Sequence, residues 1–381
     1  MKIRYVTYAR IPTRKANGLQ ISKTCEALAA RGVDVELVIP GKNRHSREER
    51  TENIFEFYSL KRNFRVVSVW VPPFLPLGNF GIFLQNIYFF IVVGISSIFV
   101  SKDTIVYSRQ PLMVVPALIF GRKAVFESHE GRWTLAIRLA VALGLRIITL
   151  TKSSVEKYAV LGMSRDKLAA VPDAVDLSLF SNLPSKDECR KIYGIDRDVF
   201  VAMYTGSFGL YGWKGSDVFL DASNKTDKPI TFYAVGATKK EISDFKATGK
   251  YSKVVFVEEK PHTERPMILN AADVLIVPNK KGDEVSELHT SPIKLFEYLA
   301  AGKPIVASKL PSLLEVLNES NAVIIEPNDA LALAQGIERL YADNGLVRRL
   351  GEASRALSRR YSWDERAREI EESINHFYEK R

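Results

Sequence analysis

Residues 289–308 read His-Thr-Ser-Pro-Ile-Lys-Leu-Phe-Glu-Tyr-Leu-Ala-Ala-Gly-Lys-Pro-Ile-Val-Ala-Ser and predict a short helix followed by a strand. Ser291 is a favourable N-cap, and Pro292 suits the first helical position because the N–H that proline lacks would have no partner there. Gly302 suits the left-handed residue that ends a helix. We therefore expect a helix over 292–301.

The start of this helix predicts an anion site, because the first N–H groups of a helix have no internal partner and its dipole is positive there. Lys294 lies in the first turn, where the dipole disfavours a cation, which indicates an anionic partner. Further along, the carboxylate of Glu297 suits the hydroxyls of a ribose, as in dinucleotide folds. A nucleotide diphosphate fits both features. A capped amphipathic helix that buries Phe296 and Leu299, with a surface glutamate, accounts for the same spacing equally well.

Each half of the chain opens with the same alternation of strand, loop and helix. The expected elements are a strand over 2–8, a loop over 9–19, a helix over 20–31 and a strand over 33–39, and then a strand over 199–205, a glycine-rich loop over 206–215, a helix over 216–224 and a strand over 230–235. This alternation is typical of α/β proteins with doubly wound parallel sheets.

The sequence therefore predicts two Rossmann-like domains facing a central cleft, because such sheets bind ligands at the carboxyl ends of their strands. We expect an N-terminal domain over 1–175, with a C-terminal helix over 362–381 packing back on it, and a C-terminal domain over 183–361. The junction falls in an acidic, proline-bounded loop over 172–184. The length of 381 residues agrees with two domains.

Composition narrows the class of protein. An apolar fraction of 46% is ordinary for globular domains, two cysteines cannot form a disulfide framework, and five scattered histidines indicate no dedicated metal site. The N-terminus carries charges where a secretion signal would be apolar, so it is read as a first strand and the protein as cytoplasmic.

Net charge is unevenly distributed along the chain. Residues 1–171 hold 25 Lys and Arg against 12 Asp and Glu, a balance of +13, whereas residues 172–381 hold 29 against 32, a balance of −3. A basic first half suits a phosphorylated acceptor or an anionic membrane. The positive residues are dispersed and lack aromatic interleaving, so we expect no nucleic-acid partner.

Residues 66–101 contain no charged side chain, and 80–100 are long enough to span a bilayer. Polar residues such as Gln85 and Asn86 disfavour a spanning helix. Two readings remain open with equal weight: a crossover helix of the core, and an apolar patch seated in the membrane interface.

Further motifs give the chain a recognisable family pattern. They are the glycine loop 206–215 ending Trp-Lys-Gly, the Ala-Asp strand over 270–278, the stretch 291–308, the strand end Phe-Glu-Ser-His-Glu over 126–130, and the Val-Pro-Asp-Ala-Val-Asp linker that begins at 171. Together they resemble a retaining glycosyltransferase of family 4, within glycosyl transferases group 1, which has the two-domain GT-B fold. The similarity covers nearly the whole chain and is strongest over 199–308.

The resemblance implies roles for particular residues. The catalytic candidates are His129, presented to the transferred sugar, Lys214, placed on the donor diphosphate, and Glu297, the ribose ligand. The donor-binding candidates are Gly18, Gly206, Ser207, Lys214, His289, Thr290, Ser291, Lys294 and Glu297. The acceptor-side candidates are Arg10, Lys15, Asn17, Arg109 and Arg132. No metal or cofactor is expected, and the nucleotide-diphosphate sugar is the donor substrate.

Two positions depart from the family's pattern. The first glutamate of the paired motif should stand eight residues before Glu297, where this chain has His289, with Glu287 and Glu284 as neighbouring candidates. The arginine usual after the glycine of the first loop is Ser207, which leaves Lys214 as the main cation there. Both changes bear on sugar identity and catalytic detail more than on nucleotide binding.

The resemblance implies an enzyme that transfers a sugar with retention to a glycan, lipid-linked or other anionic acceptor, in cell-surface polysaccharide or glycolipid synthesis. It places the protein in the cytoplasm, with peripheral contact at the inner face of the membrane. Two alternatives stay open: a nucleotide-sugar epimerase, for which the sequence offers no acid–base pair, and a non-catalytic nucleotide-sugar-binding subunit, suggested by the missing glutamate.

Overall fold

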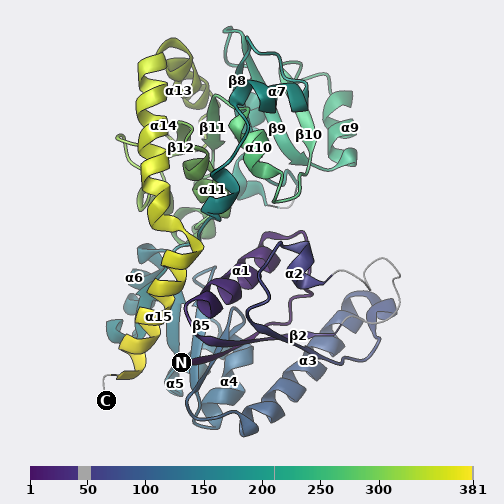
Figure 1. Cartoon of the computed structure of the whole chain (residues 1–381), viewed down its shortest axis with the longest axis vertical. Coiled ribbons are helices and arrows are strands. Elements are labelled where there is room, and N and C mark those ends of the chain that lie inside the picture. Colours follow the sequence, from purple (N-terminus) through teal and green to yellow (C-terminus); the bar gives the residue numbers. More distant parts are fainter. Residues whose placement is uncertain (42–52, 210, 380–381) are drawn as a thin grey trace. The chain divides into compact units, whose positions relative to one another are not determined.

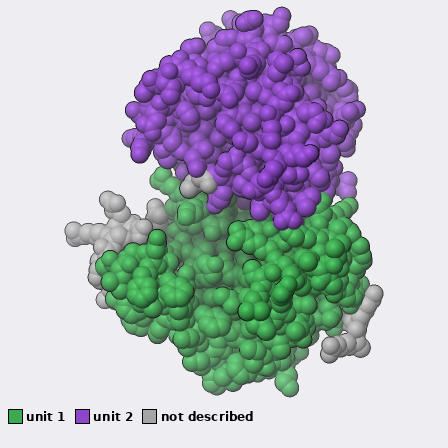
Figure 2. Space-filling model, turned by 180° about the vertical axis from the view of Figure 1, so that it is seen from behind, with its two compact units in different colours: residues 1–172, 363–381 green, residues 173–362 purple. Residues whose placement is uncertain are grey.

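The computed structural model describes residues 1–41, 53–209 and 211–379, and the chain folds into two compact units (Figure 2). Unit 1 contains Met1–Pro172 and Trp363–Arg381, and unit 2 contains Asp173–Ser362. Each unit is a parallel sheet covered by helices (Figure 1). The α/β class with two Rossmann-like domains is therefore confirmed. The cleft expected between them stays a prediction.

Unit 1 is built on a 7-stranded parallel sheet of order β3-β2-β1-β4-β5-β6-β7. Its strands are β1 (Lys2–Val6), β2 (Asp34–Pro40), β3 (Arg65–Val69), β4 (Thr104–Ser108), β5 (Lys123–Ser128), β6 (Arg146–Thr149) and β7 (Leu168–Ala170). Its helices are α1 (Ala16–Ala30), α2 (Ile54–Phe57), α3 (Gly78–Ser96), α4 (Pro111–Ile119), α5 (Leu135–Ala142), α6 (Lys152–Val160) and α15 (Trp363–Glu379), with short 3₁₀ turns η1 (Leu75–Leu77), η2 (Ser97–Phe99) and η3 (Arg165–Lys167).

Unit 2 is built on a 6-stranded parallel sheet of order β10-β9-β8-β11-β12-β13. Its strands are β8 (Phe200–Thr205), β9 (Ile230–Ala237), β10 (Val254–Glu258), β11 (Val274–Val277), β12 (Ile305–Ser308) and β13 (Val323–Ile325). Its helices are α7 (Lys186–Tyr193), α8 (Ser216–Ala222), α9 (Lys239–Ala247), α10 (Arg265–Asn270), α11 (Ile293–Ala301), α12 (Pro311–Leu314), α13 (Ala330–Ala342) and α14 (Asn344–Ser358), with short turns η4 (Leu177–Phe180), η5 (Gly212–Lys214), η6 (Val285–His289) and η7 (Arg359–Tyr361).

The central strands are fully buried, which explains their unbroken apolar sequences. Every residue of β4, β11 and β12 is buried, because helices cover both faces of a doubly wound sheet. Unit 2 encloses two apolar clusters, one of them around Phe296 and Leu299, so the apolar face predicted for α11 packs in the core as expected.

Several expected boundaries shift by a few residues, for example the end of β1 at Val6 instead of residue 8 and the end of α8 at Ala222 instead of residue 224, and two of the shifts involve glycines. Helix α1 begins at Ala16, so Gly18 lies in its first turn and not in a loop. The chain after β1 thus enters the helix earlier than expected. A Cβ added at Gly18 would lie 2.2 Å from the hydroxyl oxygen of Tyr58. In unit 2, β9 continues through Gly236 to Ala237, because Gly236 adopts a φ of 113° against the backbone of Gly206.

The C-terminal helix α15 belongs to unit 1 and packs on α1 (Figure 1). Arg31 at the end of α1 pairs with Glu371 at 3.1 Å, and the Tyr378 hydroxyl donates to the carbonyl of Ala124 at 2.8 Å. These contacts tie the end of the chain to both the helical layer and strand β5.

Candidate functional site

In unit 2 the strand order reverses between β8 and β11, and ligands of doubly wound sheets bind beside the carboxyl ends of such strands. Two loops leave this edge, 206–215 after β8 and 278–284 after β11. They touch directly, since Lys280 N–H donates to the Trp213 carbonyl at 2.7 Å. The two loops therefore form one continuous surface at the carboxyl ends of β8 and β11, which we call the shelf.

Gly215 is the closest point between the two loops. Its φ is 70°, and a Cβ added there would lie 1.8 Å from the Pro278 carbonyl oxygen. Only glycine fits both conditions, which gives a physical reason for the Trp-Lys-Gly sequence that ends the loop.

We expect Gly215→Ala to lower the free energy of unfolding of unit 2 by about 1–3 kcal/mol, because it combines left-handed strain with a backbone clash. The matched control is Gly212→Ala in the same loop, where nothing lies within 4 Å of an added Cβ. Urea denaturation of both variants measures the difference. Equal stability of the two would show that the loops do not meet as described.

Lys214 lies inside this shelf. Its ammonium group donates to the Ser207 hydroxyl at 3.2 Å and lies 4.5 Å from the ring centroid of Tyr211. Burial lowers the pKa of Lys214. The resemblance assigned Lys214 to a donor phosphate, and in the structure its ammonium group lies against an aromatic ring. It also contacts Ser207, which stands where the resemblance implies an arginine.

Lys294 is the most unusual group in the site. The residue is half-buried, but its Nζ is buried 4.2 Å from the ring centroid of Tyr204 and has no hydrogen-bond partner among the described residues. Burial, and then the charge of Lys214, hold the pKa of Lys294 well below its usual value. A buried ammonium without an acceptor is costly, so this pair of lysines is suited to an anion that neutralises both.

The amino end of α11 differs from the sequence expectation. The N-cap is Pro292, the helix begins at Ile293, and no side chain caps it. The Ser291 hydroxyl, expected to cap the helix, instead accepts a hydrogen bond from Asp173 N–H at 3.0 Å. Leu295 N–H bonds the Pro292 carbonyl at 2.8 Å, so the N–H groups of Ile293 and Lys294 are the donors of α11 that remain for a ligand. The predicted end of the helix at Gly302 is confirmed by its φ of 64°.

Glu297 lies on α11 with little exposure and pairs with Arg265 at 3.4 Å. His289, which stands where the resemblance implies a glutamate, is buried at the end of the π-helical turn η6, and its Nε2 lies 3.9 Å from a carboxylate oxygen of Glu284. Glu287 accepts a hydrogen bond from Gly282 N–H instead. Thr290 is buried beside His289. Of the two replacement candidates, Glu284 is the one with a recorded contact to His289.

One polar residue of this edge was missed by the sequence reasoning. Asn279 follows Pro278 after β11 and is fully buried, and neither of its side-chain polar atoms has a hydrogen-bond partner among the residues described. Buried amides are nearly always paired, so an orphaned one at a strand end is a candidate ligand group. An asparagine directly after an apolar strand was the available signal.

In unit 1, His129 lies just past the carboxyl end of β5, and its Nε2 is 2.6 Å from a carboxylate oxygen of Glu127. Arg366 of α15 also lies 2.9 Å from that oxygen, and Gln20 donates to it at 2.7 Å. Burial alone would raise the pKa of Glu127, but Arg366, then His129 and Arg109, hold it well below its usual value. Glu127 is thus a permanent anion that makes Nε2 of His129 the donor.

The remaining first-half candidates lie on separate elements. Arg109 donates to the Gln20 side chain at 3.0 Å, and Arg10 bonds Gln85 of α3. Arg132 is exposed and pairs with Glu130, and Lys15 is the exposed N-cap residue of α1. Asn17 is half-buried, with a side-chain oxygen that has no partner in the described part of the chain. Among the described residues Arg109 is thus the acceptor candidate tied to the Glu127 cluster.

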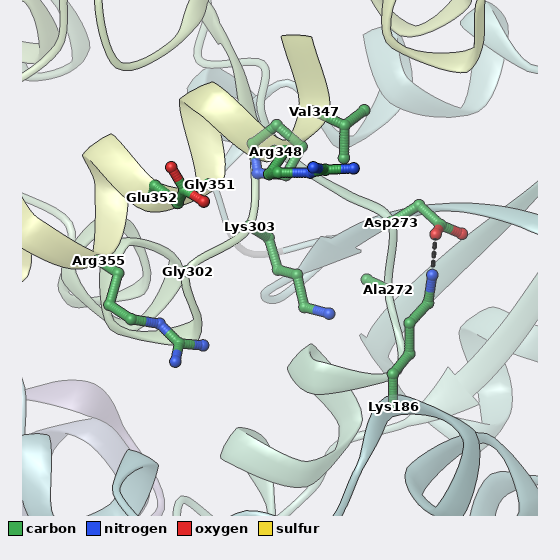
Figure 3. A pocket seen from close by; sticks show the side chains of 11 residues that line it. Lys186, Ala272, Asp273, Gly302, Lys303, Val347, Arg348, Gly351, Glu352 and Arg355 are labelled. Carbon is green, nitrogen blue, oxygen red and sulfur yellow. Dashed lines mark hydrogen bonds and ion pairs between the residues drawn. The ribbon is translucent and has the colours of Figure 1, made fainter. Parts of the chain in front are cut away.

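A separate basic pocket of about 330 Å³ lies at the opposite edge of the unit 2 sheet, lined by residues that precede β11 and β12 (Figure 3). Lys186 pairs there with Asp273, and Lys303 donates to the Asn270 carbonyl at 2.7 Å. Burial and neighbouring cations lower the pKa of Lys303 to about 8. Arg355 donates to the Ala301 carbonyl at the carboxyl end of α11, and Asn270, the acceptor of Lys303, is the last residue of α10, so both cations lie at helix carboxyl ends, where they are favourable. No group of potential metal ligands occurs in the described ranges.

Comparison with known proteins shows which proteins this site resembles. Residues 199–343 match the family model described as glycosyl transferases group 1. A D-inositol 3-phosphate glycosyltransferase from Xylanimonas cellulosilytica is 27% identical over 241 residues, 60% of this chain and 56% of that protein. The chain thus spans a little over half the length of that relative.

Solved structures share the fold over the whole chain. Sucrose-phosphate synthase from Thermosynechococcus elongatus superimposes with a TM-score of 0.76 at 17% identity, covering 100% of both chains. Anabaena HepE in complex with UDP-glucose gives a TM-score of 0.74 at 16% identity, covering 98% of this chain and 99% of that one. The GT-B fold expected from the sequence is confirmed.

Proposed function

We propose, from the match of residues 199–343 to the family model of glycosyl transferases group 1, that this chain belongs to that family and transfers a sugar from a nucleotide-diphosphate donor to an acceptor with retention of anomeric configuration. The donor's diphosphate binds at the carboxyl edge of the unit 2 sheet, between Lys214, Lys294 and the amino end of α11. The retaining mechanism follows the family 4 resemblance.

The single observation that carries the proposal is the buried ammonium group of Lys294, which feels the charge of Lys214 and has no hydrogen-bond partner among the described residues. A diphosphate supplies the negative charge that this pair lacks, and backbone N–H groups of α11 complete its hydrogen bonds. Asn279 contributes an amide to the same ligand. HepE, which has this fold, is described as binding UDP-glucose, in line with a nucleotide-sugar donor.

The same groups assist the chemistry. When the bond between the anomeric carbon and the diphosphate oxygen breaks, negative charge develops on the leaving phosphate, and preplaced cations lower the energy of that state. The acceptor oxygen bonds the anomeric carbon on the same face, and its proton passes to the departing phosphate oxygen. No protein base is then required. A role for His129 toward the transferred sugar, with Glu127 orienting its ring, rests on the family resemblance.

The acceptor is proposed to be anionic, either a phosphorylated or lipid-linked molecule or a glycan at the inner face of the cell membrane, for polysaccharide or glycolipid synthesis. The excess of basic residues in the first half supports an anionic acceptor, and the D-inositol 3-phosphate glycosyltransferase is named for a phosphorylated substrate. Arg109 and Asn17 are the candidate contacts.

A two-stage experiment tests this function. Thermal shift of the full chain against a panel of nucleotide-diphosphate sugars identifies the donor, because a ligand that binds the folded state raises its melting temperature. Product analysis by NMR with candidate acceptors then follows. A glycosylated product with the donor's anomeric configuration is expected. Conversion of the donor without acceptor would instead identify an epimerase, and binding without turnover across a broad acceptor panel a non-catalytic subunit.

We expect Glu297→Gln to weaken donor binding by about 1.5–3 kcal/mol, the range for hydrogen bonds to a charged group. Because Glu297 pairs with Arg265 at 3.4 Å, the substitution also frees that guanidinium. Titration calorimetry with a nucleoside diphosphate and with inorganic diphosphate, which lacks the ribose, separates the lost ribose contact from the effect of the altered Arg265. Unchanged nucleoside diphosphate affinity would remove Glu297 from the ribose site.

Donor binding is expected to take up protons above neutral pH. Lys294 and Lys214 have lowered pKa values in the free protein, and a bound diphosphate favours their charged forms. Donor affinity therefore falls as pH rises from the lowered pKa of Lys294 toward 10.5, its unperturbed value, whereas stability of the free protein rises across that window. Calorimetry in buffers of different ionisation enthalpy measures the uptake. Binding without net proton uptake would contradict it.

A further inference from the structure

Helix α3 exposes an unusual surface for a parallel α/β unit. It runs for 19 residues without a charged side chain, and Gly78–Phe99 is the one helical stretch in the described chain that is long and apolar enough to cross a membrane. Of the most apolar 18 residues of this stretch, only 22% are buried. Soluble domains rarely leave a continuous apolar strip of this length uncovered.

Five of the exposed residues of α3 form one stripe. Phe80, Phe83, Ile87, Ile91 and Ile95 follow each other at spacings of three or four, so they share one face of the helix. Phe83 is 57% exposed and Ile91 50%. We call these five residues the α3 stripe.

The opposite side of α3 is anchored in unit 1. Phe89 and Val93 are fully buried in its core, and Gly94 packs against Pro116 of α4. Gln85 bonds both the Pro72 carbonyl and Arg10. Because the helix is the crossover between β3 and β4 and holds part of the core, it cannot leave the sheet to span a bilayer without unfolding unit 1. The exposed side of α3 is therefore part of the outer surface of unit 1 and not of a segment that spans a membrane.

The neighbouring helices extend this surface and give it a charge. Helix α4 packs on α3, and α5 packs on α4 (Figure 1). Leu135 and Leu139 of α5 are exposed on either side of the exposed Arg138. At the far end of α3, Arg122 donates to the Ile98 carbonyl at 2.7 Å. Apart from Arg109 of the Glu127 cluster, the sequence between residues 66 and 126 has three basic residues, Lys102, Arg122 and Lys123, and one acidic residue, Asp103.

We propose that the α3 stripe, with the exposed leucines of α5, inserts into the interfacial region of an anionic lipid bilayer, while Arg122 and Arg138 contact its headgroups. An apolar face rimmed by cations matches the layered chemistry of such a membrane, with acyl chains beneath anionic headgroups. A second copy of this chain is the less suitable occupant, because a two-fold contact through this face would oppose like charges. The inference stands independently of the proposed reaction.

Flotation of the full chain with vesicles tests this surface, using phosphatidylcholine alone and phosphatidylcholine mixed with phosphatidylglycerol. The native protein is expected to float with the anionic vesicles. The double variant Phe83→Asp, Ile91→Asp should lose at least about tenfold in partition coefficient for each side chain withdrawn. Its control is Ile192→Asp, Leu331→Asp in unit 2, which changes residues of matching exposure, 58% and 50%, and should bind as the native protein does.

Three further measurements distinguish an interfacial helix from a membrane-spanning helix and from a dimer contact. Arg138→Gln should weaken binding to anionic vesicles by about fivefold and leave any binding to neutral ones unchanged. A fluorophore on Phe83→Cys should shift to the blue when vesicles are added, since the native Cys25 and Cys189 are buried and unreactive. Release of bound protein by alkaline carbonate is expected for an interfacial helix. Failure to float, retention after carbonate treatment, or a dimer that the Phe83→Asp, Ile91→Asp variant abolishes would each overturn the proposal.

Discussion

Lys294→Met is expected to make the protein more stable and nearly inactive. The native ammonium is buried beside Tyr204, has no hydrogen-bond partner among the described residues, and is repelled by Lys214. Replacing it with a side chain of similar length removes the desolvation cost, so the free energy of unfolding should rise by about 1–3 kcal/mol at neutral pH.

The same substitution removes a cation from the proposed leaving-group site. Loss of one preplaced electrostatic contact typically costs about 2.7–4 kcal/mol of transition-state stabilisation, so we expect turnover to fall by at least about a hundredfold. Urea denaturation and initial rates on one preparation measure both quantities. The control is Lys309→Met in the same unit, which changes an exposed lysine 3.5 Å from Glu326 and should alter neither. A destabilised variant with native activity would show that Lys294 is structural.

Glu127→Gln is expected to be the most destabilising polar substitution in unit 1. The carboxylate is fully buried between Arg366, His129, Gln20 and Tyr107, and its removal leaves the buried Arg366 without its anion. Breaking a buried ion pair from one side typically costs about 3–5 kcal/mol. Urea denaturation, with hydrogen exchange of α15 as the local readout, measures the loss.

Two controls separate the ion pair from general disruption. Glu371→Gln, on helix α15 with Arg366, breaks the partly exposed pair with Arg31 and should cost less than about 1 kcal/mol of unfolding free energy. Adding Arg366→Met to Glu127→Gln should recover part of the loss, though not the hydrogen bonds from Arg366 to the carbonyls of Val171 and Pro172. Because the pKa of Glu127 is lowered, its contribution is present above pH 4.5 and is lost as the pH falls below that value. A neutral effect of Glu127→Gln would contradict the buried pair.

Local sequence signals predicted the elements that carry the candidate site in unit 2. The apolar run before Gly206, the glycine at 215 and the helix ending at Gly302 each obey short-range rules of backbone geometry, and the structure follows them. The Lys294 prediction also came from a local conflict, a cation placed against a helix dipole. Its burial could not be predicted, since Tyr204 lies ninety residues away in the sequence.

The failures have the same origin in long-range contacts. Ser291 has the chemistry of an N-cap, but the Asp173 backbone uses its hydroxyl. The Glu127 cluster depends on Arg366 from the far end of the chain, and no spacing rule links the two. Residues 66–101 show the limit most clearly, because composition predicted either a core helix or a membrane patch, and α3 has a buried face and an exposed apolar one.

The most direct measurement of the central claim is a crystal structure of the full chain soaked with the nucleotide sugar that gives the largest thermal shift. We expect the diphosphate within hydrogen-bond distance of Lys294 Nζ and of the first N–H groups of α11, with Lys214 on its other side. Density for the diphosphate elsewhere, with Lys294 still enclosed and unpartnered, would contradict the account.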